Sequence, residues 1–112
     1  MTTDTAITIE TVETAVCQFY GVNARELHLT RRKLRQELSF CRFLVYYLCV
    51  KMKIATKTEI GAFYGKDHTH VLYGQHLIQS RIDTIPAVEL NVKTIERNII
   101  PTKYTQLTNS GI

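Results

Sequence analysis

Two helix-start signals on either side of a glycine turn constrain the fold of this chain more than any other feature. The first is a capping box formed by Thr56 and Glu59, which predicts a helix over residues 57–65. The second is Asp67, a favourable N-cap for a helix that runs to about Ile82. Two helices joined by so short a turn predict a helix-turn-helix, whose second helix can enter a DNA major groove.

Hydrophobic periodicity predicts two helical segments before a central one. A helix is expected over residues 8–20, with Thr8 as its N-cap and Gly21 in the left-handed position that ends it. Asn23-x-x-Glu26 resembles a capping box and predicts a short helical turn that ends near Leu27 or Leu29. The predicted apolar stripe of the first helix consists of Val12, Ala15, Val16 and Phe19.

The segment 36–53 is apolar on almost all sides, which is typical of a central helix buried by several neighbours. Its aromatic residues Phe40, Phe43 and Tyr47 leave a second interpretation open, a surface for a homodimer or for a protein partner. A last helix is expected to begin at Thr84, as N-cap, and Pro86, and to end at Pro101. The buried positions expected in the last three helices are Ile60, Phe63, Val71, Gln75, Ile78, Ile82, Val88, Val92, Ile95 and Ile99.

These segments predict an all-α fold of five or six helices in a chain of 112 residues, which is the size of one domain. We expect residues 1–7 to be a leader, residues 8–100 to be the helical domain and residues 101–112 to be a flexible tail. The N-terminus lacks a basic start and an apolar run, so we expect no signal peptide. The most apolar run, Phe40–Val50, is too short to span a membrane. A cytoplasmic protein is therefore expected.

Basic residues concentrate just before the helix-turn-helix. Residues 25–57 contain nine Lys and Arg against two Glu, whereas residues 1–24 contain three acidic residues and no Lys or Arg. Residues 58–112 are balanced, with five residues of each sign. A clustered basic patch favours a phosphate-binding surface. The alternative is a solvated basic face without a partner.

Catalytic and metal chemistry find little support in the sequence. Cys17, Cys41 and Cys49 have no metal-binding spacing and lie in apolar helical contexts, which indicates reduced core cysteines. His68 and His70 lie about 200° apart on a helix, so they do not share a face as paired metal ligands do. The run from Gly61 to Lys66 has the wrong spacing for a phosphate loop, so no bound nucleotide is expected. Together these observations predict a protein without a cofactor and without enzymatic activity.

The start of the second helix carries side chains suited to DNA. Free backbone N–H groups and the helix dipole favour a phosphate there, and Lys66 adds a positive charge. Thr69 and His70 can bond base edges or phosphates. Arg31, Arg32 and Lys33 form a basic arm that can reach an adjacent minor groove. The structural alternative is that Asp67 only caps the helix and that His68 packs against the preceding helix.

The run EIGAFYGKDHTHVL resembles the C-terminal DNA-binding domain of the bacterial replication initiator DnaA, whose signature reads close to E-I-G-x-x-F-G-G-[RK]-D-H-T-T-V-L-H-A. The resemblance covers about Ile7 to Ile82, and the D-H-T core is its most specific part. The matching residues are Glu59, Ile60, Gly61, Gly65, Lys66, Asp67, His68, Thr69, Val71 and Leu72, with Tyr64 at the aromatic position.

The resemblance implies a Trp-repressor-like helical domain that binds double-stranded DNA. It implies that Asp67, His68 and Thr69 read bases of a DnaA box and that Arg32 enters the minor groove. Further DNA contacts are expected from the arm residues Arg31 and Lys33, from Arg42, which the family keeps, from Lys57, Thr58, Lys66 and His70, and from Tyr73 on the outer face.

The sequence departs from the family signature in ways that affect the expected function. His70 replaces the second threonine, the turn has one glycine fewer, and the basic loop carries about two extra residues. We also expect a protein without the family's ATPase domain. We expect a sequence-specific DNA binder that acts as a regulator or replication accessory factor. The alternatives are the excised DNA-binding domain of a full initiator, or a protein-interaction module that kept the fold and lost specific DNA binding.

Overall fold

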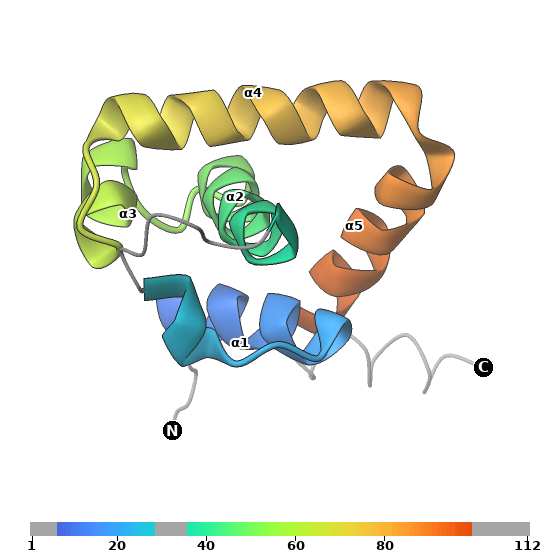
Figure 1. The fold of residues 1–112 in the computed structure, drawn as a ribbon, viewed down its shortest axis with the longest axis horizontal. Helices are drawn as coiled ribbons and strands as arrows, with labels where there is room; N and C mark the ends of the chain where they lie inside the picture. The colour runs from blue at the N-terminus through green and yellow to red at the C-terminus, as the bar shows by residue number, and fades with distance from the viewer. Residues whose placement is uncertain (1–6, 29–35, 100–112) are drawn as a thin grey trace, which may run out of the picture.

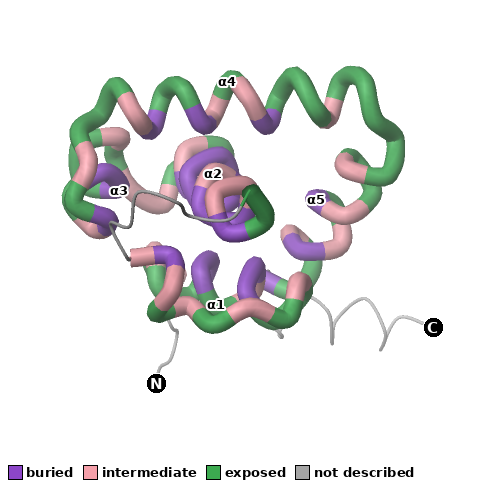
Figure 2. Tube along the Cα trace, viewed as in Figure 1, coloured by how far each residue is buried: buried purple, intermediate pink, exposed green. Residues whose placement is uncertain are grey.

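Helix α2 (Gln36–Lys51) lies at the centre of the molecule, and the other helices surround it (Figure 1). The computed structural model describes residues 7–28 and 36–99. Nine of the sixteen residues of α2 are buried, and Figure 2 draws much of this central helix in the purple of buried residues. The sequence prediction of a central helix buried by several neighbours is therefore confirmed, with its C-terminal end at Lys51 rather than residue 53.

Four more helices enclose α2, so that the described residues form an all-α fold. Helix α1 (Ile9–Tyr20) lies on one side, and α4 (His68–Thr84) crosses the opposite side. Helices α3 (Lys57–Phe63) and α5 (Pro86–Ile99) lie on the two remaining sides, left and right of α2 in Figure 1. A short 3-10 helix, η1 (Ala24–His28), follows α1. The predicted tail and all of the predicted leader except the half-buried Ile7 lie outside the described residues.

Most predicted helix boundaries are present, because they depend on local capping chemistry. Thr8 and Thr56 cap α1 and α3, Gly21 ends α1 with a φ of 68°, and Pro86 is the first residue of α5. Two capping predictions were wrong. The short helical turn predicted after Asn23 is present as η1, but Asn23 Oδ1 accepts a hydrogen bond from the N–H of Arg25 and forms no capping box. The hydroxyl of Thr84 donates to the carbonyl of Ser80 within α4, so it does not cap α5.

The buried side of α1 is rotated relative to the predicted stripe. Val12 and Val16 are fully buried as expected, but Phe19 is 37% exposed. Glu13 and Cys17 occupy the core instead, because the carboxylate of Glu13 finds hydrogen-bond donors there. A charged residue can be buried when it is paired in this way, and hydrophobic periodicity does not register such a pair.

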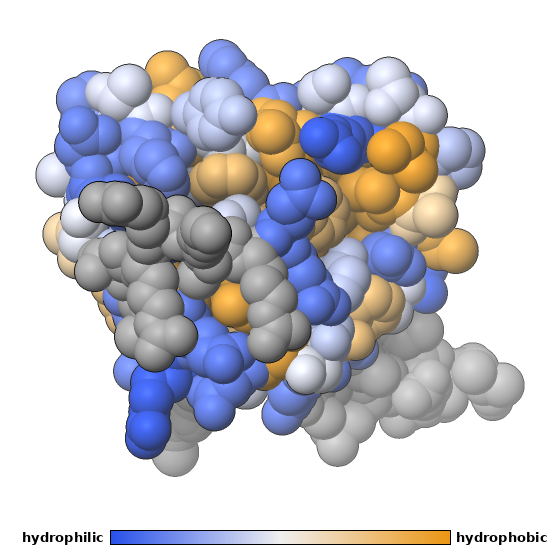
Figure 3. Space-filling model, in the orientation of Figure 1, coloured by the Kyte–Doolittle hydropathy of each residue, from blue (hydrophilic) through white to orange (hydrophobic). Residues whose placement is uncertain are grey.

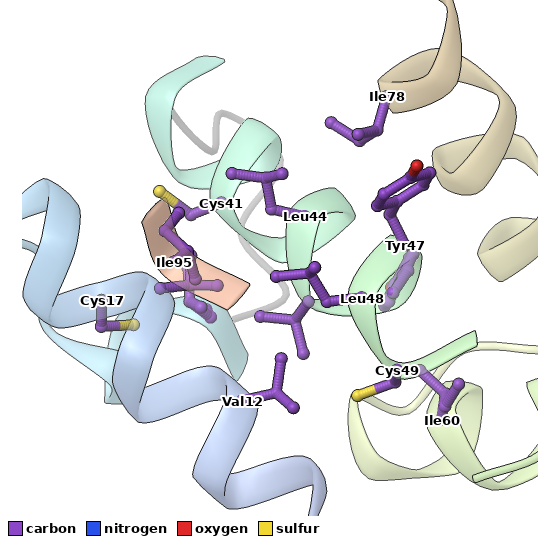
Figure 4. Packing of buried hydrophobic residues seen from close by; sticks show 14 of the residues in the cluster. Val12, Cys17, Cys41, Leu44, Tyr47, Leu48, Cys49, Ile60, Ile78 and Ile95 are labelled. Atoms are coloured by element: carbon purple, nitrogen blue, oxygen red, sulfur yellow. The ribbon is translucent and has the colours of Figure 1, made fainter. Parts of the chain in front are cut away.

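The core gathers around Leu44 and Leu48 of α2, with Val12, Ile60, Ile78 and Ile95 arriving from the four surrounding helices (Figure 4). All three cysteines are buried in or beside this cluster. Burial raises the pKa of the Cys17 thiol to about 11 and that of the Cys41 and Cys49 thiols to about 12. Such thiols stay protonated at neutral pH, which agrees with the prediction of core cysteines.

Gly74 of α4 lies directly against α2. A Cβ atom placed there would lie 2.6 Å from Cδ1 of Phe43 and 2.8 Å from Cδ2 of Tyr46, so only glycine fits between these rings. One helical turn further on, the hydroxyl of Tyr47 donates to Oε1 of Gln79. Tyr47 is only 8% exposed and Phe43 is half-buried. The contact with α4 thus removes Tyr47 from the predicted dimer or partner surface.

His70 packs into the same aromatic contact. Its ring lies 5.6 Å from the rings of Phe43 and Tyr46, and its Nδ1 is 3.0 Å from the hydroxyl of Tyr46. Partial burial lowers the pKa of His70, and the nearby positive charges of Arg42 and Lys66 lower it further, against a smaller opposing effect of Asp67. The folded protein therefore favours the neutral imidazole.

Replacing Gly74 by alanine is expected to destabilise the fold by about 1–3 kcal/mol, because the added methyl group must displace the rings of Phe43 and Tyr46. Urea denaturation of both proteins measures the loss in the free energy of unfolding. The matched control is His76→Ala on the exposed side of the same helix, for which a change within about 0.5 kcal/mol is expected. Equal stability of G74A and the original protein would contradict this view of the helix contact.

The lowered pKa of His70 predicts that the protein loses stability as the pH falls. Above the ordinary histidine pKa of about 6.5, His70 is neutral in both the folded and the unfolded state. Below that pH the unfolded state takes up the proton first, which favours unfolding until the folded pKa is also passed. Urea denaturation between pH 7.5 and 5 is expected to show a smaller loss for His70→Gln. Parallel pH profiles for the two proteins would rule out a contribution from His70.

Candidate nucleic-acid interface

The turn between α3 and α4 is closed by hydrogen bonds to Gly61. The carbonyl oxygen of Gly61 accepts bonds from the N–H groups of Tyr64 at 2.9 Å and Lys66 at 2.8 Å. A Cβ atom on Gly61 would lie 2.6 Å from the carbonyl oxygen of Lys66, so the turn folds back directly onto α3. Gly65 has a φ of 70°, a left-handed conformation that glycine adopts without strain. Gly61 and Gly65 therefore make this short turn possible.

Asp67 fixes the first turn of α4. Its Oδ1 atom accepts a hydrogen bond from the N–H of His70 at 3.1 Å, and its backbone is extended, as expected for an N-cap. The side chain of Asp67 is nevertheless exposed. The capping role predicted from the sequence is confirmed, and the exposure leaves the carboxylate accessible to a ligand in front of the helix.

One face of α4 is exposed along its first half. His68 and Thr69 lie in its first turn, and Tyr73, which is 59% exposed, lies one turn later. Val71 and Ile78, fully buried on the other face, hold the helix against the core. The exposure of His68 contradicts the alternative in which it packs against the preceding helix. Among the predicted readers, Asp67, His68 and Thr69 are thus brought together at one exposed end of α4.

The structure adds Leu72 and His76 to this face, and neither was among the predicted site residues. Leu72 is 38% exposed although it is a large apolar residue. Both residues follow His68 at helical spacings of four and eight, so the same periodicity that placed the core could have found them. The exposed face of α4 therefore offers hydrogen-bonding groups and one apolar contact together.

The remaining predicted residues have different environments. Thr58 is exposed, Lys57 and Lys66 are half-buried, and all three lie in the first turn of α3 or just before α4. His70 is turned toward the aromatic rings of α2, which does not fit the predicted contact of its ring with a phosphate. Arg31, Arg32 and Lys33 lie outside the described residues, so their role stays a prediction.

Arg42 is the clearest correction among the predicted DNA contacts. It is only 7% exposed, and its Nη1 atom donates to the carbonyl oxygen of Leu27 in η1 at 3.4 Å. The arginine thus joins η1 to α2 inside the fold. Lys51, another member of the basic block 25–57, is paired with Glu96 at 3.0 Å. Part of the basic charge that the sequence concentrates here therefore serves internal contacts.

Hydrophilic residues predominate where α3 and α4 meet on the face shown in Figure 3, whereas hydrophobic residues are visible beneath the second half of α4. This polar surface agrees with a solvated interface. Within residues 7–28 and 36–99, no three His, Cys, Asp or Glu side chains are grouped so that they could hold a metal ion. None of the helices in these ranges is long and apolar enough to cross a membrane.

Comparison with known proteins identifies a family with a similar sequence. The family model of the bacterial dnaA protein helix-turn-helix matches residues 9–78. The chromosomal replication initiator protein DnaA of Streptococcus pyogenes serotype M4 is 31% identical over 96 residues. That of Streptococcus uberis is also 31% identical, and that of Streptococcus equi subsp. zooepidemicus is 30% identical, over the same length.

These alignments cover 85% of this chain and 21% of each relative, so the chain spans about a fifth of the length of the initiators it matches. The family match includes α1, η1, α2, α3, the turn and most of α4. The helix-turn-helix predicted from the capping signals is therefore the family's own element. This chain belongs to the family of the bacterial DnaA protein helix-turn-helix.

Proposed function

We propose that this protein binds double-stranded DNA in a sequence-specific manner, with the first half of α4 in the major groove of a DnaA-box-like site. The observation that carries the proposal is the exposed group His68, Thr69 and Leu72 on a helix whose opposite face is locked into the core. A reading helix needs both properties, because base contacts require a fixed direction.

The exposed side chains suit the chemistry of base edges. His68 can donate or accept a hydrogen bond, and the hydroxyl of Thr69 can do both. The methyl group of Thr69 and the side chain of Leu72 can contact a thymine methyl group, which only the major groove presents. Asp67 can accept a hydrogen bond from a cytosine amino group while it caps the helix. These side chains can therefore discriminate between base pairs.

Phosphate contacts would fix the protein on the duplex. Thr58 and Lys57 at the start of α3, with Lys66 before α4, lie on the two sides of the turn and can bond successive phosphates. The arm with Arg31, Arg32 and Lys33 is proposed to enter the adjacent minor groove, where narrow A·T segments attract arginine. The two groups together would span a major groove and its neighbouring minor groove.

Because the helix-turn-helix family matches most of the chain, we infer a role that rests on DNA binding by this domain. A transcriptional regulator or a replication accessory factor satisfies this condition. A protein-interaction module is the second candidate, favoured by the groove that Phe40, Phe43, Tyr73 and Leu77 line between α2 and α4. Titration with duplex DNA separates the two, since absence of binding even at low salt would favour the module.

His68→Ala and Thr69→Ala are each expected to cost about 1–3 kcal/mol of binding free energy, because each removes base contacts. The measurement is a fluorescence titration with a duplex that contains a DnaA box and with a shuffled duplex of the same composition. Affinity for the shuffled duplex should change little. Ser80→Ala, exposed two turns beyond the proposed readers, is the matched control and should leave both affinities unchanged.

Arg32→Ala is expected to weaken binding and to reduce the preference for A·T pairs beside the core site, because the arginine is proposed to lie in the minor groove. The same titration at several salt concentrations should show a slope of log affinity against log salt that is reduced by about one. An unchanged slope together with an unchanged flanking preference would place the arm away from the duplex.

A further inference from the structure

A buried carboxylate joins three segments that lie far apart in the sequence. Glu13 of α1 has a side chain that is 8% exposed. Its Oε2 atom accepts a hydrogen bond from the hydroxyl of Tyr64 at 2.9 Å and lies 2.6 Å from Nε2 of His28. Tyr64 belongs to the turn between α3 and α4, and His28 is the last residue of η1. One oxygen atom therefore connects α1, η1 and the turn.

The chemistry of the three groups assigns a direction to both bonds. Burial and the adjacent Glu13 raise the pKa of Tyr64, so its hydroxyl remains protonated and donates. A carboxylate oxygen only accepts, so the second bond requires a proton on Nε2 of His28. Removal of either donor would leave a buried carboxylate with one of its two partners, which is costly in a low-dielectric interior.

Aromatic packing reinforces the same geometry. The ring of His28 stacks on that of Tyr64 with centroids 4.5 Å apart and an angle of 21° between the planes. The ring of Phe63 meets His28 edge-on at 4.9 Å. Stacking alone would allow the rings to slide, whereas two directional bonds to one oxygen atom allow a single arrangement.

The position of this cluster relates it to DNA binding. Tyr64 directly precedes Gly65, the residue at which the chain turns toward α4. His28 directly precedes the segment 29–35, which contains Arg31, Arg32 and Lys33. The cluster thus fixes both the turn before the reading helix and His28, the last described residue before the basic arm in the sequence.

We propose that Glu13, His28 and Tyr64 are positioning residues. They fix the position of the reading helix relative to His28, the residue from which the basic arm begins. Glu13 and Tyr64 act without touching DNA, because both are buried. The inference rests on the proposed function, since it concerns how the two parts of that interface are kept in register.

Two substitutions remove the bonds and keep the rings. Tyr64→Phe deletes the hydroxyl, and His28→Phe deletes the Nε2 donor. Tyr47→Phe is the matched control, because it deletes the buried hydroxyl that bonds Gln79 at a place remote from the turn and from His28. Circular dichroism and urea denaturation establish that all three variants are folded under the binding conditions.

Titration with the DnaA-box duplex is expected to show binding weakened about fivefold or more by Tyr64→Phe and by His28→Phe, and unchanged binding for Tyr47→Phe. Double substitutions give the sharper readout. In an Arg32→Ala background, His28→Phe should weaken binding by less than twofold, because the contact that it positions is already absent. In a Thr69→Ala background it should keep its full effect.

Two results would overturn the inference in distinguishable ways. If the unmodified protein binds the DnaA-box duplex specifically and both phenylalanine variants bind as Tyr47→Phe does, the cluster only stabilises the core, and the proposed function stands. If the unmodified protein binds neither the DnaA-box duplex nor the shuffled duplex at low salt, the proposed function fails and the inference fails with it.

Discussion

The contact between α4 and α2 at Gly74 determines the direction of every side chain on the exposed face of α4. The rings of Phe43 and Tyr46 fill the space where a Cβ atom of residue 74 would stand. This contact fixes the distance of α4 from α2 and the rotation of α4 about its own axis. Val71 and Ile78 reinforce that rotation from the same side. His68, Thr69 and Leu72 are exposed as a consequence of this contact, and the proposed reading of DNA depends on it.

The parts of the fold that the sequence predicted correctly depend on short-range chemistry. A capping box needs only two residues three apart, so Thr56 and Glu59 predict the start of α3 from the local sequence alone. Asp67, as an N-cap, predicts the start of α4 in the same way. The central place of α2 follows from an apolar surface on nearly all of its sides, which only burial by several elements can satisfy.

The errors share a physical cause, which is that the partner lies far away in the sequence. Glu13 is buried and Phe19 exposed because hydrogen-bond donors from residues 28 and 64 reach the carboxylate. Arg42 is an internal contact because a carbonyl group of η1 lies beside it. His70, expected at the DNA, faces the hydroxyl of Tyr46. Periodicity and charge counting describe a residue and its near neighbours, so they do not report such pairs.

The exposed face of α4 can accept substitutions, whereas the face that packs on the core must keep its residues for the fold to form. The positions 68, 69, 72, 73 and 76 are exposed, so under the proposed function exchanges there would alter the DNA preference at small cost in folding. His70 faces inward instead, where its ring lies beside Phe43 and Tyr46 of α2. A lineage of such domains could therefore acquire new target sites while its architecture stayed constant.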